Sequence, residues 1–229
     1  MAHSSTNRRR ATLATLCLAL ALAASQARVA PNPPPRSAEG LELKTRTKQR
    51  IVYLRPGATF AQYTRLAILD PYIEFSARWL RDYNRSAHHR IADSDLARAR
   101  ADLSVQLKKV FAEELTRGRY RIAPVAAADT LVLRPALVNI EVNAPDLMTP
   151  GRTVTYAWSA GQMTLYLELW DSSTNTILAR VVDARADSEV YGQRMGRVTN
   201  RAAGDRILRA WARELHAKLD LARGHSAAN

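Results

Sequence analysis

Four carboxylates near the ends of expected strands are the residues best placed for catalysis. Asp70 follows an apolar run, Glu74 lies four residues further on, and Asp171 and Asp183 border the two halves of an expected hairpin. Paired carboxylates can act as general acid and general base in hydrolysis. Carboxylates at such positions more often cap turns as solvated side chains, which is the preferred interpretation here. Asp171 and Asp183 approach each other only if the hairpin returns in a suitable register.

Two adjacent histidines, His88 and His89, lie in a polar segment that we expect to be a loop. Adjacent side chains point apart on a strand and are not partners on a helix, so the pair cannot readily share one metal ion. The sequence also lacks a glycine-rich phosphate loop, a Gly-x-Ser-x-Gly elbow and the zinc motifs His-Glu-x-x-His and Cys-x-x-Cys. We therefore assign no catalytic, cofactor-binding or metal-binding residue.

Two aromatic residues, Tyr166 and Trp170, form the candidate partner-binding patch. Over residues 163–170 aliphatic side chains alternate with polar and aromatic ones, so both rings lie on the face opposite the aliphatic set. Large aromatic side chains are enriched at the centres of protein interfaces. The same rings could instead pack beneath a helix, and both interpretations stay open.

The strands that would position these residues follow from hydrophobic periodicity. The alternating segment is followed by a polar turn at 172–176 and an apolar return at 177–183, which predicts a hairpin. The segment 131–142 predicts a long strand in which Pro135 causes a break or an edge position. Shorter strands are expected at 50–54, 66–69, 120–122 and 153–160, and no structure is assigned to residues 72–79.

Two amphipathic helices complete the expected fold. Asp93-Ser94-Asp95 can cap a helix whose apolar stripe runs from Leu96 to Leu115 and which ends at Gly118. A second helix begins near Thr199 or Asn200 and ends at Gly224. Its apolar stripe contains Leu208, Trp211, Leu215, Leu219 and Ala222. The order of elements predicts an α+β domain, a mostly antiparallel sheet with both amphipathic helices packed on one face.

The first 27 residues have the pattern of a signal peptide. Three arginines at 8–10 precede an apolar run at 11–24, and small residues surround the expected cleavage point at Ala27. Cleavage after Ala23 and an uncleaved anchor are the alternatives. We expect a periplasmic or secreted protein.

The sole cysteine, Cys17, lies inside the apolar run and follows Leu16. A lipid-attachment cysteine needs a small residue before it and a completed apolar run, so lipid anchoring at Cys17 is not expected. A mature chain without Cys17 would form no disulfide, which suits an oxidising compartment.

Clustered prolines in residues 28–42 predict an extended linker. The folded domain is expected at 43–224, with a short tail at 225–229. The formal net charge of +13 comes mostly from arginine. A basic surface attracts nucleic acid, anionic lipid or acidic glycans. Because the arginines are scattered, nucleic acid is not expected as a partner. An envelope protein, a glycan and an anionic membrane surface are the candidate partners.

Two passages resemble a known bacterial family. They are Leu54-Arg55-Pro56-Gly57-Ala58-Thr59-Phe60 with the following residues to Phe75, and Leu165-Tyr166-Leu167-Glu168-Leu169-Trp170-Asp171 with Thr174 to Ala179. Both are similar to domain-of-unknown-function family number 3313, whose members are exported, often as lipoproteins. The strand-turn-strand is also similar to small envelope lipoprotein domains of the curli-secretion and penicillin-binding-protein-activator type.

The resemblance supplies no catalytic residues. Together with the signal-peptide pattern and the missing catalytic motifs, it favours an exported cell-envelope protein that serves as a non-enzymatic binding or accessory module. An exported hydrolase that uses the strand-end carboxylates, and a polyanion-binding protein, are the alternatives.

Overall fold

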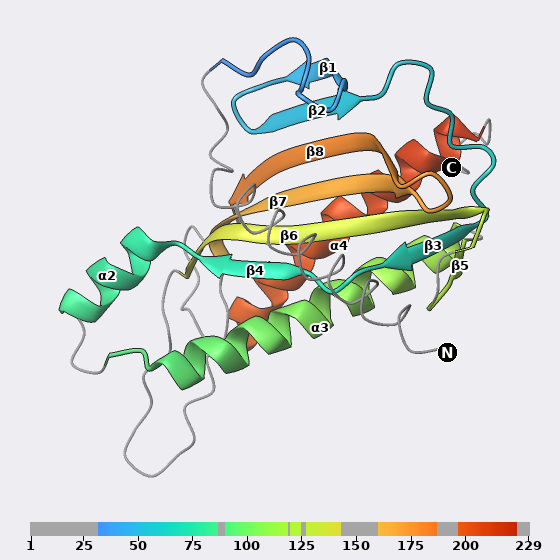
Figure 1. The fold of residues 1–229 in the computed structure, drawn as a ribbon. Coiled ribbons are helices and arrows are strands. Elements are labelled where there is room, and N and C mark those ends of the chain that lie inside the picture. The colour runs from blue at the N-terminus through green and yellow to red at the C-terminus, as the bar shows by residue number, and fades with distance from the viewer. Residues whose placement is uncertain are drawn as a thin grey trace, which may run out of the picture.

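The computed structural model describes residues 32–86, 90–118, 120–124, 127–142, 160–186 and 197–223. The expected signal peptide, Cys17 and the pair His88 and His89 lie outside these ranges. Within the described ranges, an eight-stranded sheet and three helices form one α+β domain (Figure 1). The elements are β1 Glu42–Arg46, β2 Arg50–Leu54, β3 Arg65–Ile68, β4 Tyr72–Phe75, α2 Ala77–Ser86, α3 Asp93–Arg117, β5 Arg121–Ile122, β6 Thr130–Val142, β7 Ala160–Asp171, β8 Thr176–Ala186 and α4 Arg197–Ala222.

The sheet is mostly antiparallel, as the sequence predicts. Its order is β1-β2-β8-β7-β6-β3-β5, and the run from β1 to β6 is antiparallel throughout. On the other edge of β6, strands β3 and β4 pair with it in parallel, one after the other. The strand β4 and the helix α2 occupy residues 72–79, to which the sequence analysis assigned no structure.

Strand β6 is continuous, so the break predicted as one alternative at Pro135 is absent, whereas the other alternative, an edge position, is met locally. The strand β3 ends opposite Leu133 and β4 begins opposite Ala136. Pro135 has no N–H to donate, and it lies where one neighbouring strand gives way to the next. The gap between β3 and β4 supplies a local edge, so the rest of β6 can stay central.

The predicted hairpin is confirmed as β7 and β8. In β7 the aliphatic residues Met163, Leu165, Leu167 and Leu169 are buried in the main core with residues of α3 and α4. The alternate residues of β7 therefore lie on the opposite face of the sheet, which we call the outer face. The two faces of β7 are both largely buried, unlike a sheet with one solvated side.

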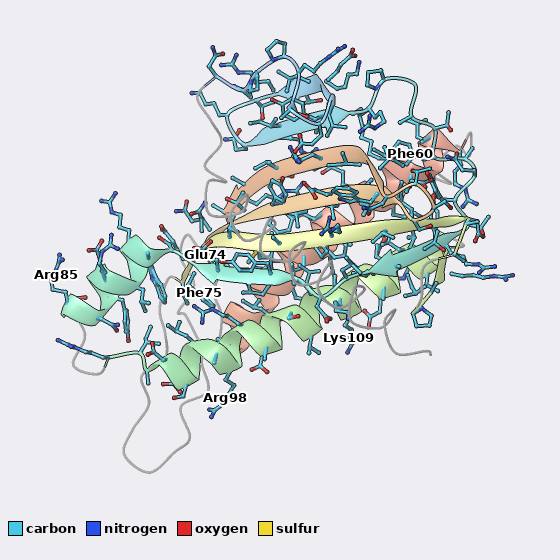
Figure 2. All side chains as sticks on the ribbon, viewed as in Figure 1. Phe60, Glu74, Phe75, Arg85, Arg98 and Lys109 are labelled. Atoms are coloured by element: carbon cyan, nitrogen blue, oxygen red, sulfur yellow. The ribbon has the colours of Figure 1, made fainter. Side chains whose placement is uncertain are left out.

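The two long helices pack on one face of the sheet, as predicted (Figure 1). The stripe expected on α3 is buried, while Arg98 and Lys109 lie on its exposed side (Figure 2). The predicted stop at Gly118 is confirmed. The predicted cap differs, because Ala92 is the N-cap and makes no side-chain hydrogen bond. The first turn still carries Asp93 and Asp95 at the positive end of the helix.

Residues 32–41 differ from the expected linker. The side chain of Leu41 is fully buried, and the hydroxyl of Tyr53 donates to the carbonyl of Pro34 at 2.7 Å. Arg180 on β8 also pairs with Glu39 at 2.8 Å. Proline-rich composition alone could not reveal these contacts, because they depend on the β2 and β8 side chains that receive the segment. No helix within the described ranges is long and apolar enough to cross a membrane.

Candidate functional site

The helices leave one end of the sheet uncovered. Seven strand positions about 4.8 Å apart make the sheet about 29 Å wide, whereas two helices packed side by side cover about 20 Å. Figure 1 shows β1 and β2 at the edge beyond α4. A cavity of about 520 Å³ lies there, between α4 and strands β1, β2, β7 and β8. We call it the α4 groove.

The floor of the α4 groove is apolar. Strand residues Val52, Leu54 and Val181 line it and are only partly buried. Leu215 lines it from α4, and Phe60 lies next to the C-terminal end of that helix (Figure 2). An apolar cavity of this volume with a few polar groups at its rim is typical of a ligand-binding site.

Two residues expected in the core of α4 belong to this groove. Leu208, Trp211 and Leu219 of the predicted stripe are buried, but Leu215 is partly exposed and Ala222 is exposed. The apolar stripe of α4 therefore continues beyond the part of the sheet that the helix covers. The exposed end of that stripe is the helix wall of the α4 groove.

The rim of the α4 groove carries more cations than anions. Lys44, Arg50 and Lys218 line it together with one carboxylate, Glu214. The guanidinium of Arg50 donates to Glu214 and to Asp183, at 2.5 Å in the latter case. Hydrogen bonds from Arg50 lower the pKa of the Glu214 carboxyl, outweighing the opposing effect of burial. Arg50 and Glu214 therefore form an ion pair in which the two charges cancel.

The two lysines are the exposed cations of the rim. Among the described residues, Lys44 pairs only with the partly exposed Glu42, at 3.0 Å. Such surface pairs contribute little energy and can open. Within the part of the chain that the structure describes, the ammonium of Lys218 has no hydrogen bond or ion pair. Neither lysine was predicted as a site residue, since nothing in the sequence connects β1 with the end of α4.

The four strand-end carboxylates are not brought together. Asp70 pairs with Lys108 at 2.7 Å on the surface, and Glu74 lies on β4 (Figure 2). In the β7–β8 register Asp171 is opposite Thr176, and Asp183 is opposite Leu165. Six residues of strand, about 20 Å, separate those two positions. The register that a catalytic pair of Asp171 and Asp183 requires is therefore absent.

Asp183 is only 4 % exposed, so it is not the solvated turn-capping carboxylate that was expected, whereas Asp171 caps the turn. Asp171 accepts the amides of Ser173 and Thr174 at 2.9 and 2.7 Å and the hydroxyl of Tyr63 at 2.5 Å. Desolvation raises the pKa of Asp171, but these hydrogen bonds outweigh it and lower that pKa overall. Burial and the bond to Asp171 raise the pKa of Tyr63 to about 12. Asp171 is thus the turn cap that the sequence analysis preferred.

Tyr166 and Trp170 lie on the outer face. Tyr166 is only 5 % exposed, and Trp170 is half-buried. Neither ring lies beneath α3 or α4. The expectation that the two rings pack under a helix is therefore not met by α3 or by α4. Their role as a partner-binding patch stays a prediction.

A buried carboxylate holds both rings in place. Glu168 is 3 % exposed and accepts the Tyr166 hydroxyl and the Trp170 indole N–H, each at 2.9 Å. Directly across the β7–β8 ladder, Arg180 donates to Glu168 at 2.8 Å and to Glu39 at the same distance. Burial and the nearby Glu168 charge raise the pKa of Tyr166, so its hydroxyl stays a donor. The bond from Arg180 lowers the pKa of Glu39 to about 2.

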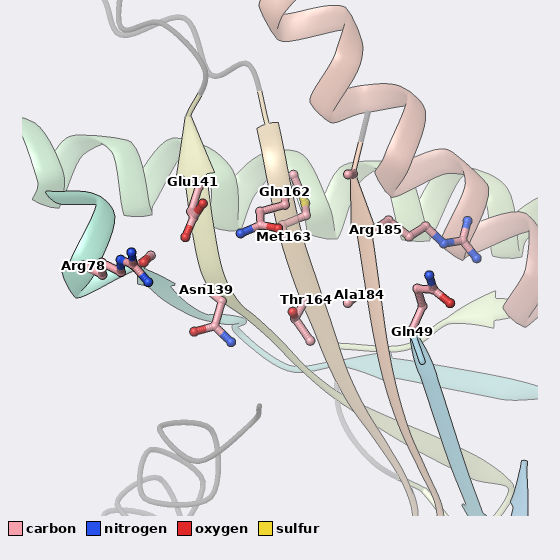
Figure 3. Close-up of a pocket in the computed structure, with 11 residues that line it drawn as sticks. Gln49, Arg78, Asn139, Glu141, Gln162, Met163, Thr164, Ala184 and Arg185 are labelled. Atoms are coloured by element: carbon pink, nitrogen blue, oxygen red, sulfur yellow. The ribbon is translucent and has the colours of Figure 1, made fainter. Parts of the chain in front are cut away.

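A second hollow, of about 510 Å³, lies at the far end of β6, β7 and β8 (Figure 3). Arg78, Asn139, Glu141, Gln162 and Arg185 contribute its polar lining. The strands there lead into residues 143–159 and 187–196, which lie outside the described ranges. Among the residues described, no group of three or more His, Cys, Asp or Glu side chains could hold a metal ion.

Comparison with known proteins gives a family and several distant structures. The family model "Protein of unknown function (DUF3313)" matches residues 36–215. No curated protein sequence matches the chain. A PelC dodecamer from Paraburkholderia phytofirmans is similar at 16 % identity and a TM-score of 0.37, covering 77 % of this chain and 98 % of that one.

Two further solved structures are similar at the same level. A DUF330 protein from Xanthomonas campestris has 12 % identity and a TM-score of 0.42, covering 72 % of this chain and 89 % of that one. A minor lipoprotein from Acinetobacter baumannii has 13 % identity and a TM-score of 0.32, covering 68 % and 94 %. No functional property follows from likeness at this level.

Proposed function

The chain belongs to the DUF3313 family of proteins of unknown function, and from this premise we propose that it is an exported cell-envelope protein acting as a non-enzymatic binding module. The α4 groove is the binding site. It holds the apolar part of a ligand between the end of α4 and the uncovered strands.

The apolar floor of the α4 groove is the observation that carries this proposal. Val52, Leu54, Val181 and Leu215 leave apolar surface in contact with water although the domain has a complete core elsewhere. Covering such surface with an apolar ligand is favourable by about 25 cal/mol for each Å² removed from water. Binding of an apolar ligand in this groove is therefore expected to lower the free energy.

The polar groups of the domain support binding rather than catalysis. Asp183 and Glu214 accept bonds from Arg50 and Arg185, and Glu168 accepts bonds from Arg180. Ion pairs of this kind hold the participating side chains in place. They do not leave an acid and a base free on either side of a substrate, as general acid–base catalysis needs.

Export is supported by the leader pattern of residues 1–27 and by a family match that begins after it, at residue 36. We expect the full chain, expressed in a Gram-negative host, to be recovered from the periplasm without its leader. N-terminal sequencing should then begin at Arg28, or at Ala24 if the alternative site is used. Recovery of the uncleaved chain from the cytosol would overturn the export proposal.

The groove itself is tested with an uncharged fluorescent apolar probe, N-phenyl-1-naphthylamine. We expect the purified domain to bind the probe with a large rise in fluorescence. Val52→Trp should fill the groove and weaken the binding at least tenfold, because the added ring occupies the floor. Probe affinity is measured by fluorescence titration and folding by circular dichroism.

A matched substitution checks that the effect is local. Val105 is 68 % exposed on α3, remote from the α4 groove, so Val105→Trp adds the same ring to the surface without touching the site. Probe affinity should be unchanged in that variant. Equal loss in both variants, or a wild-type domain that binds no probe, would contradict a binding function for the groove.

A further inference from the structure

We propose that the ligand of the α4 groove is a long-chain fatty acid, with its acyl chain on the apolar floor and its carboxylate at Lys44 and Lys218. This inference rests on the proposed function, because it names the ligand of the same groove. It adds the chemical class, the orientation and the two residues that select the head group.

The charge at the rim selects an anion. Three cations and one carboxylate line the groove, and Arg50 already satisfies Glu214. The remaining positive charge belongs to Lys44, whose only ion pair is exposed, and to Lys218, which is unpaired within the described ranges. A carboxylate placed between them would gain two charge-assisted hydrogen bonds from donors that are otherwise solvated.

The floor selects a single flexible chain. Its walls are aliphatic over most of their length, and four different elements contribute Leu54, Leu169, Val181 and Leu219. A volume of about 520 Å³ lies in the range for one drug-sized ligand. That range suits one acyl chain, and a two-chain phospholipid would leave its second chain in water.

The position of the lysines sets the orientation of the chain. Lys44 lies on β1 at the outer edge of the sheet, and Lys218 lies on the exposed side of α4, so both flank the open side of the groove. The inner end is closed by the buried residues Leu165 and Trp211. The carboxylate therefore stays at the solvent side, where its hydration is largely kept, and the methyl end points inward.

The test compares three ligands that share a twelve-carbon chain. Laurate, dodecanol and dodecyltrimethylammonium are titrated into the full mature chain below their micelle concentrations, by displacement of N-phenyl-1-naphthylamine. Laurate should bind at least tenfold more tightly than the ammonium compound. Because each buried methylene contributes about 0.8 kcal/mol, laurate should also bind about fifteenfold more tightly than decanoate.

Charge reversal at the rim provides the residue-level test. The double variant Lys44→Glu, Lys218→Glu should lose about tenfold in laurate affinity and should reverse the preference toward dodecyltrimethylammonium. The double variant Arg98→Glu, Lys109→Glu makes the same change of net charge on the exposed side of α3 and should leave both affinities unchanged. Circular dichroism verifies folding of each variant.

The outcomes separate this inference from the proposed function. If all three head groups bind equally and affinity still follows chain length, the groove binds apolar ligands and the fatty acid assignment is wrong. If laurate is preferred but the double charge reversal changes nothing, Lys44 and Lys218 do not hold the carboxylate and the inference is again wrong. If neither the probe nor any twelve-carbon ligand binds, the proposed function fails together with it.

Discussion

Replacing Arg180 by methionine is expected to lower the free energy of unfolding by about 3–5 kcal/mol, because it leaves a buried carboxylate without its counter-charge. Glu168 is 3 % exposed and cannot turn toward water. Two neutral donors, Tyr166 and Trp170, would remain bonded to it. Neutral hydrogen bonds do not offset the cost of burying a full negative charge. Urea unfolding followed by circular dichroism measures the loss.

A second substitution distinguishes the loss of the Arg180 charge from the loss of packing by its aliphatic stem. Adding Glu168→Gln to Arg180→Met removes the unpaired charge while keeping an oxygen for Tyr166 or Trp170. We expect the double variant to regain most of the stability, so the two substitutions should be strongly non-additive. Additive losses would show that Arg180 acts through packing alone. The control Arg78→Met breaks an ion pair between Arg78, which is 83 % exposed, and Asp82, which is 54 % exposed, and should cost under about 1 kcal/mol.

The same variant should respond to acid in a characteristic direction. In the wild type, the bond from Arg180 lowers the pKa of Glu39 to about 2. A carboxyl whose pKa is lower in the folded state than in the unfolded state contributes stability above its unfolded pKa, and this contribution is lost as the pH falls through the folded pKa. The variant lacks this contribution, so the stability gap between Arg180→Met and the wild type should narrow between about pH 5 and pH 2. A gap that widens with acid would contradict the interpretation.

Hydrophobic periodicity was sufficient for the elements that are regular along their whole length. The stripe of α3 and the alternation of β7 each repeat enough times that face and element type follow from spacing. Residues 72–79 were left unassigned because a four-residue strand is followed almost at once by a helix. A window of eight residues then contains part of a strand period and part of a helix period, and neither pattern is dominant.

A shift in strand register hid the buried pair of Glu168 and Arg180 from hairpin arithmetic. A turn over residues 172–175 places Asp171 opposite Thr176, and uninterrupted pairing from there would put Glu168 opposite Ala179. The register shifts between Leu169 and Trp170, and this shift puts Glu168 opposite Arg180. Opposite charges that face each other across an antiparallel pair stabilise it. The sequence could not show that the pair would be buried, since that depends on what lies over the outer face.

The α4 groove could not be predicted for a different physical reason. The stripe of α4 reads as a core-facing face to its last residue, and within the helix nothing distinguishes Leu219, which is buried, from Leu215, which is not. How much of the sheet the helices cover depends on the number of strands relative to the number of helices. That ratio is a property of the whole sheet and not of one helix. The strand β1 widens that sheet, and residues 43–46 carried no strand prediction although they were placed in the folded domain.

Asp183→Ala is expected to cost about 3 kcal/mol, the second of the two largest effects. Asp183 is 4 % exposed and accepts bonds from Arg50, Arg185 and the indole of Trp211, the last at 3.0 Å. The two arginines are about a quarter exposed and can turn to water or to Glu214. Trp211 is 2 % exposed, so its N–H stays buried without an acceptor.

The amide Asp183→Asn separates these contributions, because it keeps an oxygen for the Trp211 indole while removing the charge. We expect it to cost about 1–2 kcal/mol in urea unfolding, and equal losses for both variants would show that the indole contact contributes nothing. The exposed control Asp82→Asn should change stability by under about 1 kcal/mol.

Removing the Asp183 charge also leaves Arg50 more positive at the rim of the α4 groove. Laurate should therefore bind Asp183→Asn more tightly than the wild type, even though the variant is less stable. Weaker binding in the folded variant would mean that Asp183 supports the groove through its shape rather than by restraining its charge.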